Sequence, residues 1–322
     1  MSFYRSFRLL VLSMMLSAGC ARETLLALPT EEALPESSQT STPEQEPGEA
    51  QDTPDNDSTP EPEPDAPTVV DPEPEPEPIP PPPEDDCAET SELLYTVDKG
   101  NGALYLFDPV RGTFRYLGIP DCGPFAGTPT SMAVARNGRA YIRYSSQTLY
   151  VIELDSLECT ETAMQVSAFG SFGMGYATLH AETWEDELFI ANRSTLARLD
   201  TTTFSVHPLG GLPSQSELTG NARGELWGVF PLESPAQIME LDRETGIPLQ
   251  SITLSFMPSP TTIDTFAFAT WGGDFFVFLR LYGMGASTQV YRVSPTGTTE
   301  LLSQDTGRNI VGVGVSTCAP TH

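Results

Sequence analysis

The sequence predicts an all-β domain, a five-bladed β-propeller in which the C-terminal strand completes the first blade. Strand-forming segments separated by Gly- and Pro-containing turns fill residues 87–322, without a long stretch of helical periodicity. A strand–turn–strand unit recurs five times, and its third strands end at successive spacings of 47, 45, 42 and 52 residues. A four-stranded antiparallel blade needs a repeat of about this length. The matching strand ends are residues 106–108, 153–155, 198–200, 240–242 and 292–294.

The first unit differs from the other four because it lacks an innermost strand and the turn that would follow it. In three of the other units glycine precedes the second strand and supplies the positive φ of a tight hairpin. The fourth has Glu185–Asp186 there instead, so we expect a longer turn or another turn type. The apolar segment 309–315 is the candidate for the missing strand. Its pairing with residues 93–97 would close the ring and remove the open sheet edges.

The N-terminus combines a basic flank, a short apolar run and a cysteine. Two arginines precede the apolar run 9–16, and residues 16–20 read Leu-Ser-Ala-Gly-Cys. These features resemble the lipobox signal peptide of bacterial lipoproteins. A run this short cannot span ~30 Å of hydrocarbon. The resemblance implies removal of residues 1–19 and acylation of Cys20. The lipid anchor would then attach the protein to a bacterial membrane. Ala21 stands where some bacteria use Asp for retention at the inner membrane, which favours the outer membrane or the cell surface.

Residues 20–86 are predicted to be a disordered tether between the lipidated Cys20 and the folded domain. Residues 21–86 hold 17 of the 30 prolines, and their 20 acidic residues and one arginine give −19 of the formal net charge of −28. Glu-Pro repeats and the run 80–83 have few backbone donors, repel one another and favour polyproline II. Fully extended at ~3.1 Å per residue, this segment would reach on the order of 200 Å.

The remaining residues, 87–322, are predicted to be one domain. They carry 24 acidic and 13 basic side chains, a net charge of −11. Binding to nucleic acid needs a basic stripe, and the sequence has none. We therefore expect no nucleic-acid partner. We also expect the domain to be monomeric.

Four cysteines remain after Cys20, and an exported domain meets an oxidising compartment. Four cysteines allow three pairings. We favour Cys87–Cys318, because this bond would join the two ends of the ring, and Cys122–Cys159 then follows by elimination. The absence of a Cys-x-x-Cys pair argues against a metal site.

Three segments resemble the motifs of an uncharacterised group of propeller-like bacterial lipoproteins. They are residues 172–175 (Phe-Gly-Met-Gly), 267–275 and 313–320. The likeness spans most of residues 90–320. It implies the propeller fold and carries no activity.

Catalytic and metal-binding motifs are sparse in this sequence. The three histidines, His180, His207 and His322, are far apart and form no zinc pattern, and neither a nucleophile elbow nor a phosphate loop is present. One hypothesis concerns Glu217 and Asp264, which precede the innermost strands of adjacent units and would face the channel mouth. Paired carboxylates there could serve a glycosidase, or hold a metal as in a lactonase-like enzyme. We expect no cofactor, and the balance favours a non-catalytic protein.

The hypothesis that we prefer is a binding module for protein, peptide or glycan in the envelope or outside the cell. Long connections at 118–130, 169–176, 230–236 and 280–288 should lie on the same face as the two carboxylates. Aromatic side chains on such loops suit a binding surface. The candidates are Phe125, Phe172, Tyr176, Phe230 and Tyr282, with Met284 beside them. A spacer without a ligand is the third possibility.

Overall fold

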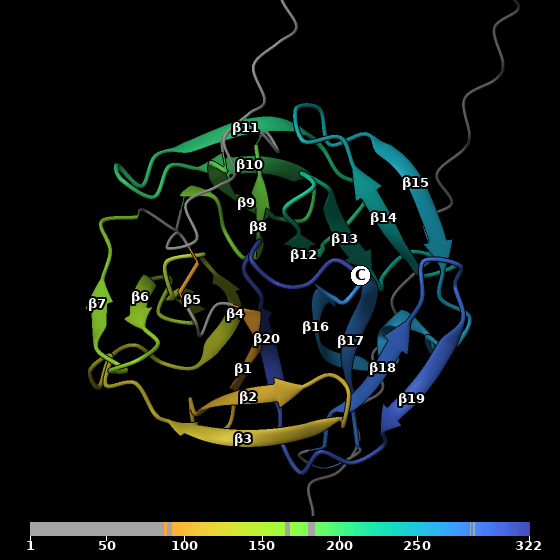
Figure 1. Cartoon of the computed structure of the whole chain (residues 1–322), viewed down its shortest axis with the longest axis horizontal. Coiled ribbons are helices and arrows are strands. Elements are labelled where there is room, and N and C mark those ends of the chain that lie inside the picture. The colour runs from red at the N-terminus through yellow and green to blue at the C-terminus, as the bar shows by residue number, and fades with distance from the viewer. Residues whose placement is uncertain (1–86, 89–91, 165–167, 180–183, 284, 286) are drawn as a thin grey trace, which may run out of the picture. The chain divides into compact units, whose positions relative to one another are not determined.

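The computed structural model describes residues 87–88, 92–164, 168–179, 184–283, 285 and 287–322. These residues form five antiparallel sheets of four strands each, arranged around a central axis (Figure 1). The predicted five-bladed propeller is thus confirmed. No helix in the described ranges has the length and apolar character needed to span a bilayer.

Each blade has an inner, a second, a third and an outer strand. The inner strands are β20 (Ile310–Gly314), β4 (Pro129–Val134), β8 (Gly173–Thr178), β12 (Glu217–Gly220) and β16 (Ile263–Trp271). The second strands are β1 (Leu94–Asp98), β5 (Arg139–Tyr144), β9 (Asp186–Ala191), β13 (Leu226–Phe230) and β17 (Asp274–Leu281). The third strands are β2 (Leu104–Asp108), β6 (Leu149–Glu153), β10 (Thr195–Leu199), β14 (Gln237–Leu241) and β18 (Gln289–Val293). The outer strands are β3 (Thr113–Gly118), β7 (Cys159–Glu161), β11 (Val206–Gly211), β15 (Pro248–Thr253) and β19 (Thr299–Ser303).

The ring closes through the last strand of the chain, as the sequence predicts. β20 pairs antiparallel with β1, with Tyr95 opposite Gly314 and Thr96 opposite Val313. Because β1, β2 and β3 come from the start of the domain, this blade is built from both ends of the described chain (Figure 1). Closure gives the first blade its fourth strand, so that β1 is paired on both sides like the second strands of the other blades.

The hydrophobic core consists of five clusters, each between two neighbouring blades. Tyr95 and Leu104 of the first blade, for example, share a cluster with Met132 and Ile142 of the second. On the other side of the first blade, Phe107 meets Phe278 of the fifth blade with ring centroids 5.2 Å apart. Every blade therefore buries side chains on both faces, and the ring is stable only when each blade has two neighbours.

The inner strands come close together around the axis, and glycine makes this possible. At Gly220 on β12, a Cβ atom would lie 2.5 Å from the carbonyl oxygen of Tyr176 on β8. That separation is too short for any side chain, so the two backbones can approach only where one residue has none. The central channel is consequently narrow.

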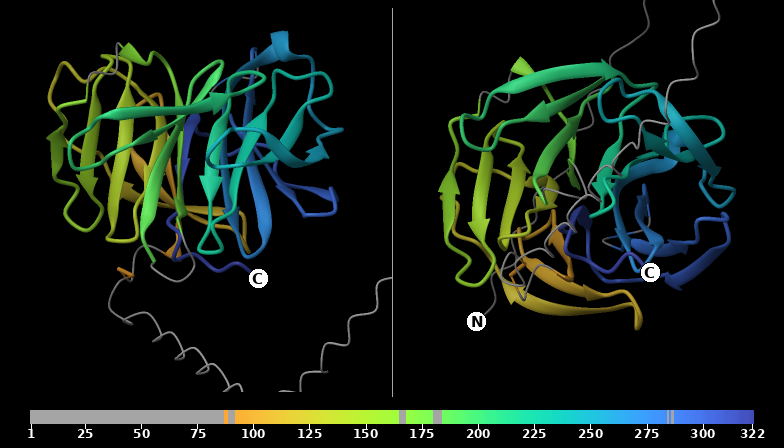
Figure 2. Two further views of the ribbon diagram at one scale, coloured as in Figure 1. Left: turned by 90° about the horizontal axis from the view of Figure 1, so that it is seen from above. Right: turned by 45° about the horizontal axis from the view of Figure 1, so that its top comes forward.

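The two ends of the ring differ. We call the end where the inner strands begin the loop face, and the opposite end the closure face. The register of Glu217 with Val229, and of Ile263 with Leu281, places the β13–β14 and β17–β18 connections on the loop face. The C-terminus lies on the closure face, at the lower side of the ring in the left panel of Figure 2.

Two disulfides join the four cysteines of the described residues, and they are the pairs that the sequence favours. Cys87–Cys318 joins residues 231 apart on the closure face, and Cys122–Cys159 joins residues 37 apart. The first bond fastens the segment before β1 to the segment after β20. The second ties the 118–129 connection to the start of β7, and it thereby constrains a loop-face segment.

Candidate functional site

The candidate site is a cavity of about 270 Å³ at the mouth of the central channel, on the loop face. Both carboxylates singled out in the sequence, Glu217 and Asp264, line it. Glu217 is the first residue of β12, and Asp264 lies within β16, which begins one residue earlier than Asp264 at Ile263. The other lining residues are Lys99, Pro129, Thr130, Ser171, Gln215, Thr265, Phe266 and Val311.

Glu217 is buried at the inner wall of this cavity. The Ser131 hydroxyl on β4 donates a hydrogen bond of 2.7 Å to Glu217 Oε2, and the backbone N–H of Met174 is a second donor to the carboxylate. At Gly173 on β8 a Cβ atom would come within 2.9 Å of the Glu217 carboxyl carbon, so glycine is needed beside it. Three inner strands, β4, β8 and β12, thus hold this side chain.

Burial raises the pKa of the Glu217 carboxyl well above its ordinary value, because an ionised carboxylate loses its hydration there. The hydrogen bonds from Ser131 and Met174 and the positive charge of Arg143 act in the opposite direction. Burial therefore favours the protonated form of Glu217, and carboxyl groups perturbed in this way are common in functional sites.

Arg143 on β5 is the cation behind Glu217. It is buried, its Nη1 donates to Thr130 Oγ1 at 2.7 Å, and its guanidinium lies 5.4 Å from the centre of the Phe172 ring. Burial lowers the pKa of Arg143, and the charge of Glu217 opposes this. No ion pair within 4.0 Å joins Arg143 to Glu217 among the described residues. The two charges thus act on each other only at longer range.

Asp264 differs from Glu217 because it has a direct ionic partner. Arg280 on β17 donates from Nη1 to Asp264 Oδ2, and its Nε donates to the carbonyl oxygen of Gly285 at 2.9 Å. The charge of Asp264 is thereby compensated within the fifth blade. The two carboxylates share a cavity but have different environments, which is the condition for different roles.

The structure separates the aromatic candidates into two groups. Phe125 is 90% exposed and Tyr282 is 66% exposed, both on loop-face connections. Phe172, Tyr176 and Phe230 are buried, so their prediction as surface contacts is wrong. The reason is the strand boundaries: Tyr176 lies within β8, Phe230 ends β13, and Phe172 packs beneath Arg143. Met284 lies outside the described residues.

Sequence reasoning missed two exposed apolar residues on the loop face. Ile119 follows β3 in the connection to β4, and Leu232 lies in the β13–β14 connection. Aliphatic residues in loops carry no periodic signal, so only their position in the fold reveals them. Together with Phe125 and Tyr282 they place four large apolar side chains on loops at one end of the ring.

The other sequence candidates add no further site. Cys20 and His180 lie outside the described residues. His207 is exposed on β11, and His322 contacts Thr321 at the closure face. Within the part of the chain that the structure describes, no three His, Cys, Asp or Glu side chains converge as metal ligands would.

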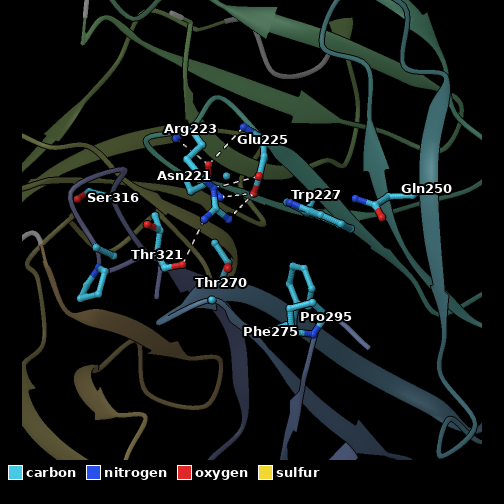
Figure 3. Close-up of a pocket in the computed structure, with 14 residues that line it drawn as sticks. Asn221, Arg223, Glu225, Trp227, Gln250, Thr270, Phe275, Pro295, Ser316 and Thr321 are labelled. Carbon is cyan, nitrogen blue, oxygen red and sulfur yellow. Dashed lines mark hydrogen bonds and ion pairs between the residues drawn. The ribbon is translucent and has the colours of Figure 1, made fainter. Parts of the chain in front are cut away.

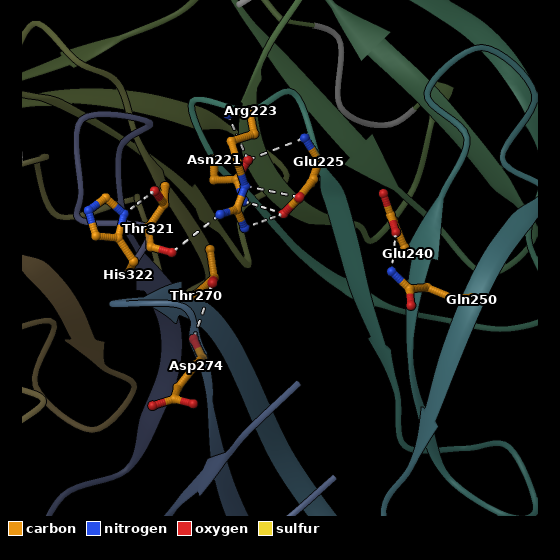
Figure 4. Close-up of polar contacts among 9 residues, drawn as sticks. All are labelled: Asn221, Arg223, Glu225, Glu240, Gln250, Thr270, Asp274, Thr321 and His322. Carbon is orange, nitrogen blue, oxygen red and sulfur yellow. Dashed lines mark hydrogen bonds and ion pairs between the residues drawn. The ribbon is translucent and has the colours of Figure 1, made fainter. Parts of the chain in front are cut away.

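The closure face has its own cleft, about 180 Å³ in volume, between the fourth and fifth blades and the C-terminal segment (Figure 3). Trp227 and Phe275 form its base, with ring centroids 4.8 Å apart. Arg223 donates to Glu225 through Nε and Nη2, each at 3.0 Å, as Figure 4 shows.

The C-terminal segment is fastened across this cleft. The N–H of Gly272 donates to the Pro320 carbonyl at 2.7 Å, and Arg223 Nη1 lies 3.4 Å from the Thr321 carbonyl (Figure 4). The polar groups of this face are thus largely engaged in holding the end of the chain, whereas the cavity on the loop face is lined by Glu217, a carboxyl of raised pKa, and by Asp264. This contrast makes the loop face the better candidate for function.

Comparison with known proteins adds no family to these observations. No protein-family model matches the chain, and no curated protein matches its sequence. Among solved structures, a chain in the crystal structure of a nidogen/laminin complex is similar in fold, with a TM-score of 0.45. The two chains are 12% identical, and the similarity covers 69% of this chain and 97% of that one.

Proposed function

We propose that this protein is a lipid-anchored extracytoplasmic module that binds a protein partner through the loop face of its propeller. The observation that carries the proposal is the set of four exposed apolar side chains on that face, Ile119, Phe125, Leu232 and Tyr282. Ile119 and Phe125 lie in the β3–β4 connection, Leu232 in the β13–β14 connection and Tyr282 in the β17–β18 connection, so three connections at one end of the ring carry them. Exposed aromatic residues dominate the energetics of protein interfaces, and apolar patches on a soluble domain mark such interfaces.

The anchoring part of the proposal rests on the sequence. The lipobox-like residues 16–20 and the acidic, Pro-rich segment that follows suit a domain held away from a membrane surface. The protein would then be located at the outer membrane or the cell surface of a bacterium. A domain tethered in this way can meet partners in the envelope or outside the cell.

The experiment is capture of partners by the full-length chain from envelope extract of the source bacterium, with loop-face variants in parallel. Phe125→Ala and Tyr282→Ala should each weaken capture of a reproducible partner about tenfold or more, as loss of an interfacial aromatic does. Val110→Ala and Ile247→Ala serve as controls, because both residues are exposed in turns on the closure face. Equal capture by all four variants contradicts the proposal. Capture of glycan alone, or of nothing reproducible, would favour a lectin or a spacer instead.

A hydrolase is the second candidate, and one observation favours it: Glu217 and Asp264 line the same cavity in different environments. Glycosidases use two carboxyl groups in one site, one of them an acid of raised pKa, and Glu217 and Asp264 share a cavity in which the pKa of Glu217 is raised. Glu217→Gln and Asp264→Asn should then each abolish turnover of a glycoside or lactone, measured at a temperature where both variants are folded, because Asp264→Asn also removes the ionic partner of Arg280. Wild-type protein that turns over no member of a broad glycoside and lactone panel would exclude this candidate. The metal-dependent version lacks a ligand set, since no three suitable side chains converge in the described ranges.

A further inference from the structure

A groove of about 480 Å³ lies on the closure face between the first and fifth blades, apart from the cavity at the channel mouth. It is lined by the β2–β3 hairpin, by Leu93 before β1 and by Trp271, the last residue of β16. Seven of its eleven lining residues are apolar. The volume is in the range of sites that bind small molecules or a few residues of a peptide.

The aromatic groups of this groove are fixed in place and partly open to solvent. Trp271 Nε1 donates to the carbonyl oxygen of Glu92 at 3.0 Å, which fixes the orientation of the indole ring. Phe114 packs against Phe107 with ring centroids 4.9 Å apart. Trp271 and Phe114 are half-buried, and Leu93 is 37% exposed. A surface that is already ordered loses little conformational entropy when a ligand covers it.

The lining of the groove has one acidic residue, Asp108, and two basic ones, Arg111 and Arg115. Asp108 accepts from the N–H groups of Val110 and Arg111 at 2.9 and 3.0 Å, and Arg111 Nη1 forms an ion pair with it at 2.7 Å. Arg115 is exposed on β3 and forms no ion pair within 4.0 Å among the described residues. The groove therefore offers one unmatched guanidinium, which can donate to carboxylates and to carbonyl oxygens.

The segment directly before Cys87 has the composition that such a groove would bind. Residues 74–86 contain seven prolines and five carboxylates and no basic residue. Pro-rich chains favour polyproline II, which has no internal hydrogen bonds, and grooves lined by aromatic side chains bind this conformation. The carboxylates complement the charge of Arg115.

The same segment joins the domain on the face that carries the groove. Cys87 is bonded to Cys318 on the closure face, and Leu93, at the groove, follows six residues later. Six residues span at most about 22 Å. The seven residues 80–86 extend equally far, about 22 Å, in polyproline II. Residues 74–83 can therefore reach the groove.

We propose that residues 74–83 bind in this groove of their own chain, with prolines against Trp271 and Phe114 and a glutamate on Arg115. Residues 20–73 then remain as the tether. This inference goes beyond the proposed function and does not depend on it, because the loop face takes no part in it. Val110 also lines the groove, and it stays a valid control for capture through the loop face, since the occupant belongs to the same chain.

The test is fluorine NMR of the full-length chain labelled with fluorotryptophan, in which Trp271→Phe assigns the resonance of Trp271. In the proline-to-serine variant, all seven prolines of residues 74–83 are replaced by serine. This variant should leave the groove empty and so move the Trp271 resonance. A synthetic peptide of residues 74–83, titrated into this variant, should return the resonance to its wild-type position. The peptide should bind the wild type at least about tenfold more weakly, because the segment in the same molecule competes at a high effective concentration.

An exchange of charges tests the contact with Arg115. In the proline-to-serine variant, Arg115→Glu should weaken binding of the peptide about fivefold, because an attractive contact becomes a repulsive one. A peptide with Glu75→Lys and Glu77→Lys should recover that loss. Arg193→Glu is the matched control and should leave the affinity unchanged. Arg193 is exposed in the β9–β10 turn and, like Arg115, has no ion pair within 4.0 Å among the described residues.

Three results would overturn the proposal. An identical Trp271 resonance in the wild type and the proline-to-serine variant would mean that the segment does not occupy the groove. Equal affinity of these two proteins for the peptide would mean that the groove binds a Pro-rich segment of another molecule instead. Equal affinity of the Arg115→Glu and Arg193→Glu proteins for the peptide would mean that Arg115 makes no specific contact with it.

Discussion

Replacing both Cys87 and Cys318 by serine is expected to lower the free energy of unfolding by about 5 kcal/mol. The bond closes a loop of 231 residues, and a cross-link that spans so long a segment removes much of the conformational freedom of the unfolded chain. For a domain of this size the loss corresponds to a fall in melting temperature of roughly 10–20 °C. Thermal unfolding of both proteins in non-reducing buffer measures it.

The matched control is the second disulfide. Replacing Cys122 and Cys159 by serine opens a loop of only 37 residues, so its effect should be about 1–2 kcal/mol smaller. The order of the two melting temperatures is the informative result. A Cys87/Cys318 variant as stable as the wild type would mean that the backbone pairing of β20 with β1 holds the ring without help from the bond.

The repeat spacing and the orphan apolar segment 309–315 were sufficient to predict the ring from sequence. The reason is physical: each blade is a local unit, and only one long-range pairing, between β20 and β1, is needed to close it. The cysteines at residues 87 and 318 then lie at the two ends that closure brings together. The fold was therefore accessible because four of the five sheets are built from strands that are consecutive in the chain.

The site was less accessible, because its side chains come from different blades. Ser131 and Glu217 are 86 residues apart, and no pattern in the sequence predicts their hydrogen bond. The ion pair Asp264–Arg280 could have been predicted from the sequence, since the β16–β17 hairpin places Thr265, the neighbour of Asp264, opposite Arg280. The burial of Tyr176 and Phe230 could not be predicted, because it depends on strand boundaries that sequence reasoning places only to within a few residues.

Removing the ion pair between Arg136 and Asp186 should also destabilise the ring, by about 3–5 kcal/mol. Arg136 lies in the β4–β5 turn of the second blade, and Asp186 is the first residue of β9 in the third. Arg136 Nε donates to Asp186 Oδ2 at 3.0 Å, and Nη2 donates to Oδ1 at 3.2 Å. Thr317, just beyond β20, donates to Asp186 Oδ2 at 2.5 Å and accepts from Arg136 at 3.0 Å. One ion pair thus links two blades and the C-terminal segment.

The expected loss of stability is large because both side chains of the ion pair are buried. The side chains of Arg136 and Asp186 are only 13% and 8% exposed, so Arg136→Met would leave the Asp186 carboxylate buried without its cation. Arg139, the first residue of β5, provides the control. It pairs with Glu153 on the surface, where the two side chains are 49% and 37% exposed, and Arg139→Met should cost less than about 1 kcal/mol.

The double variant Arg136→Met/Asp186→Asn distinguishes an ion pair from two independent contacts. Since the first substitution already leaves a buried charge, removal of that charge by the second should restore part of the lost stability, and the two effects should not add. Urea unfolding of the wild type, the two single variants and the double variant gives the coupling free energy. Additive losses, or equal losses in Arg136→Met and Arg139→Met, would mean that the disulfide and the β20–β1 pairing alone hold the closure face together.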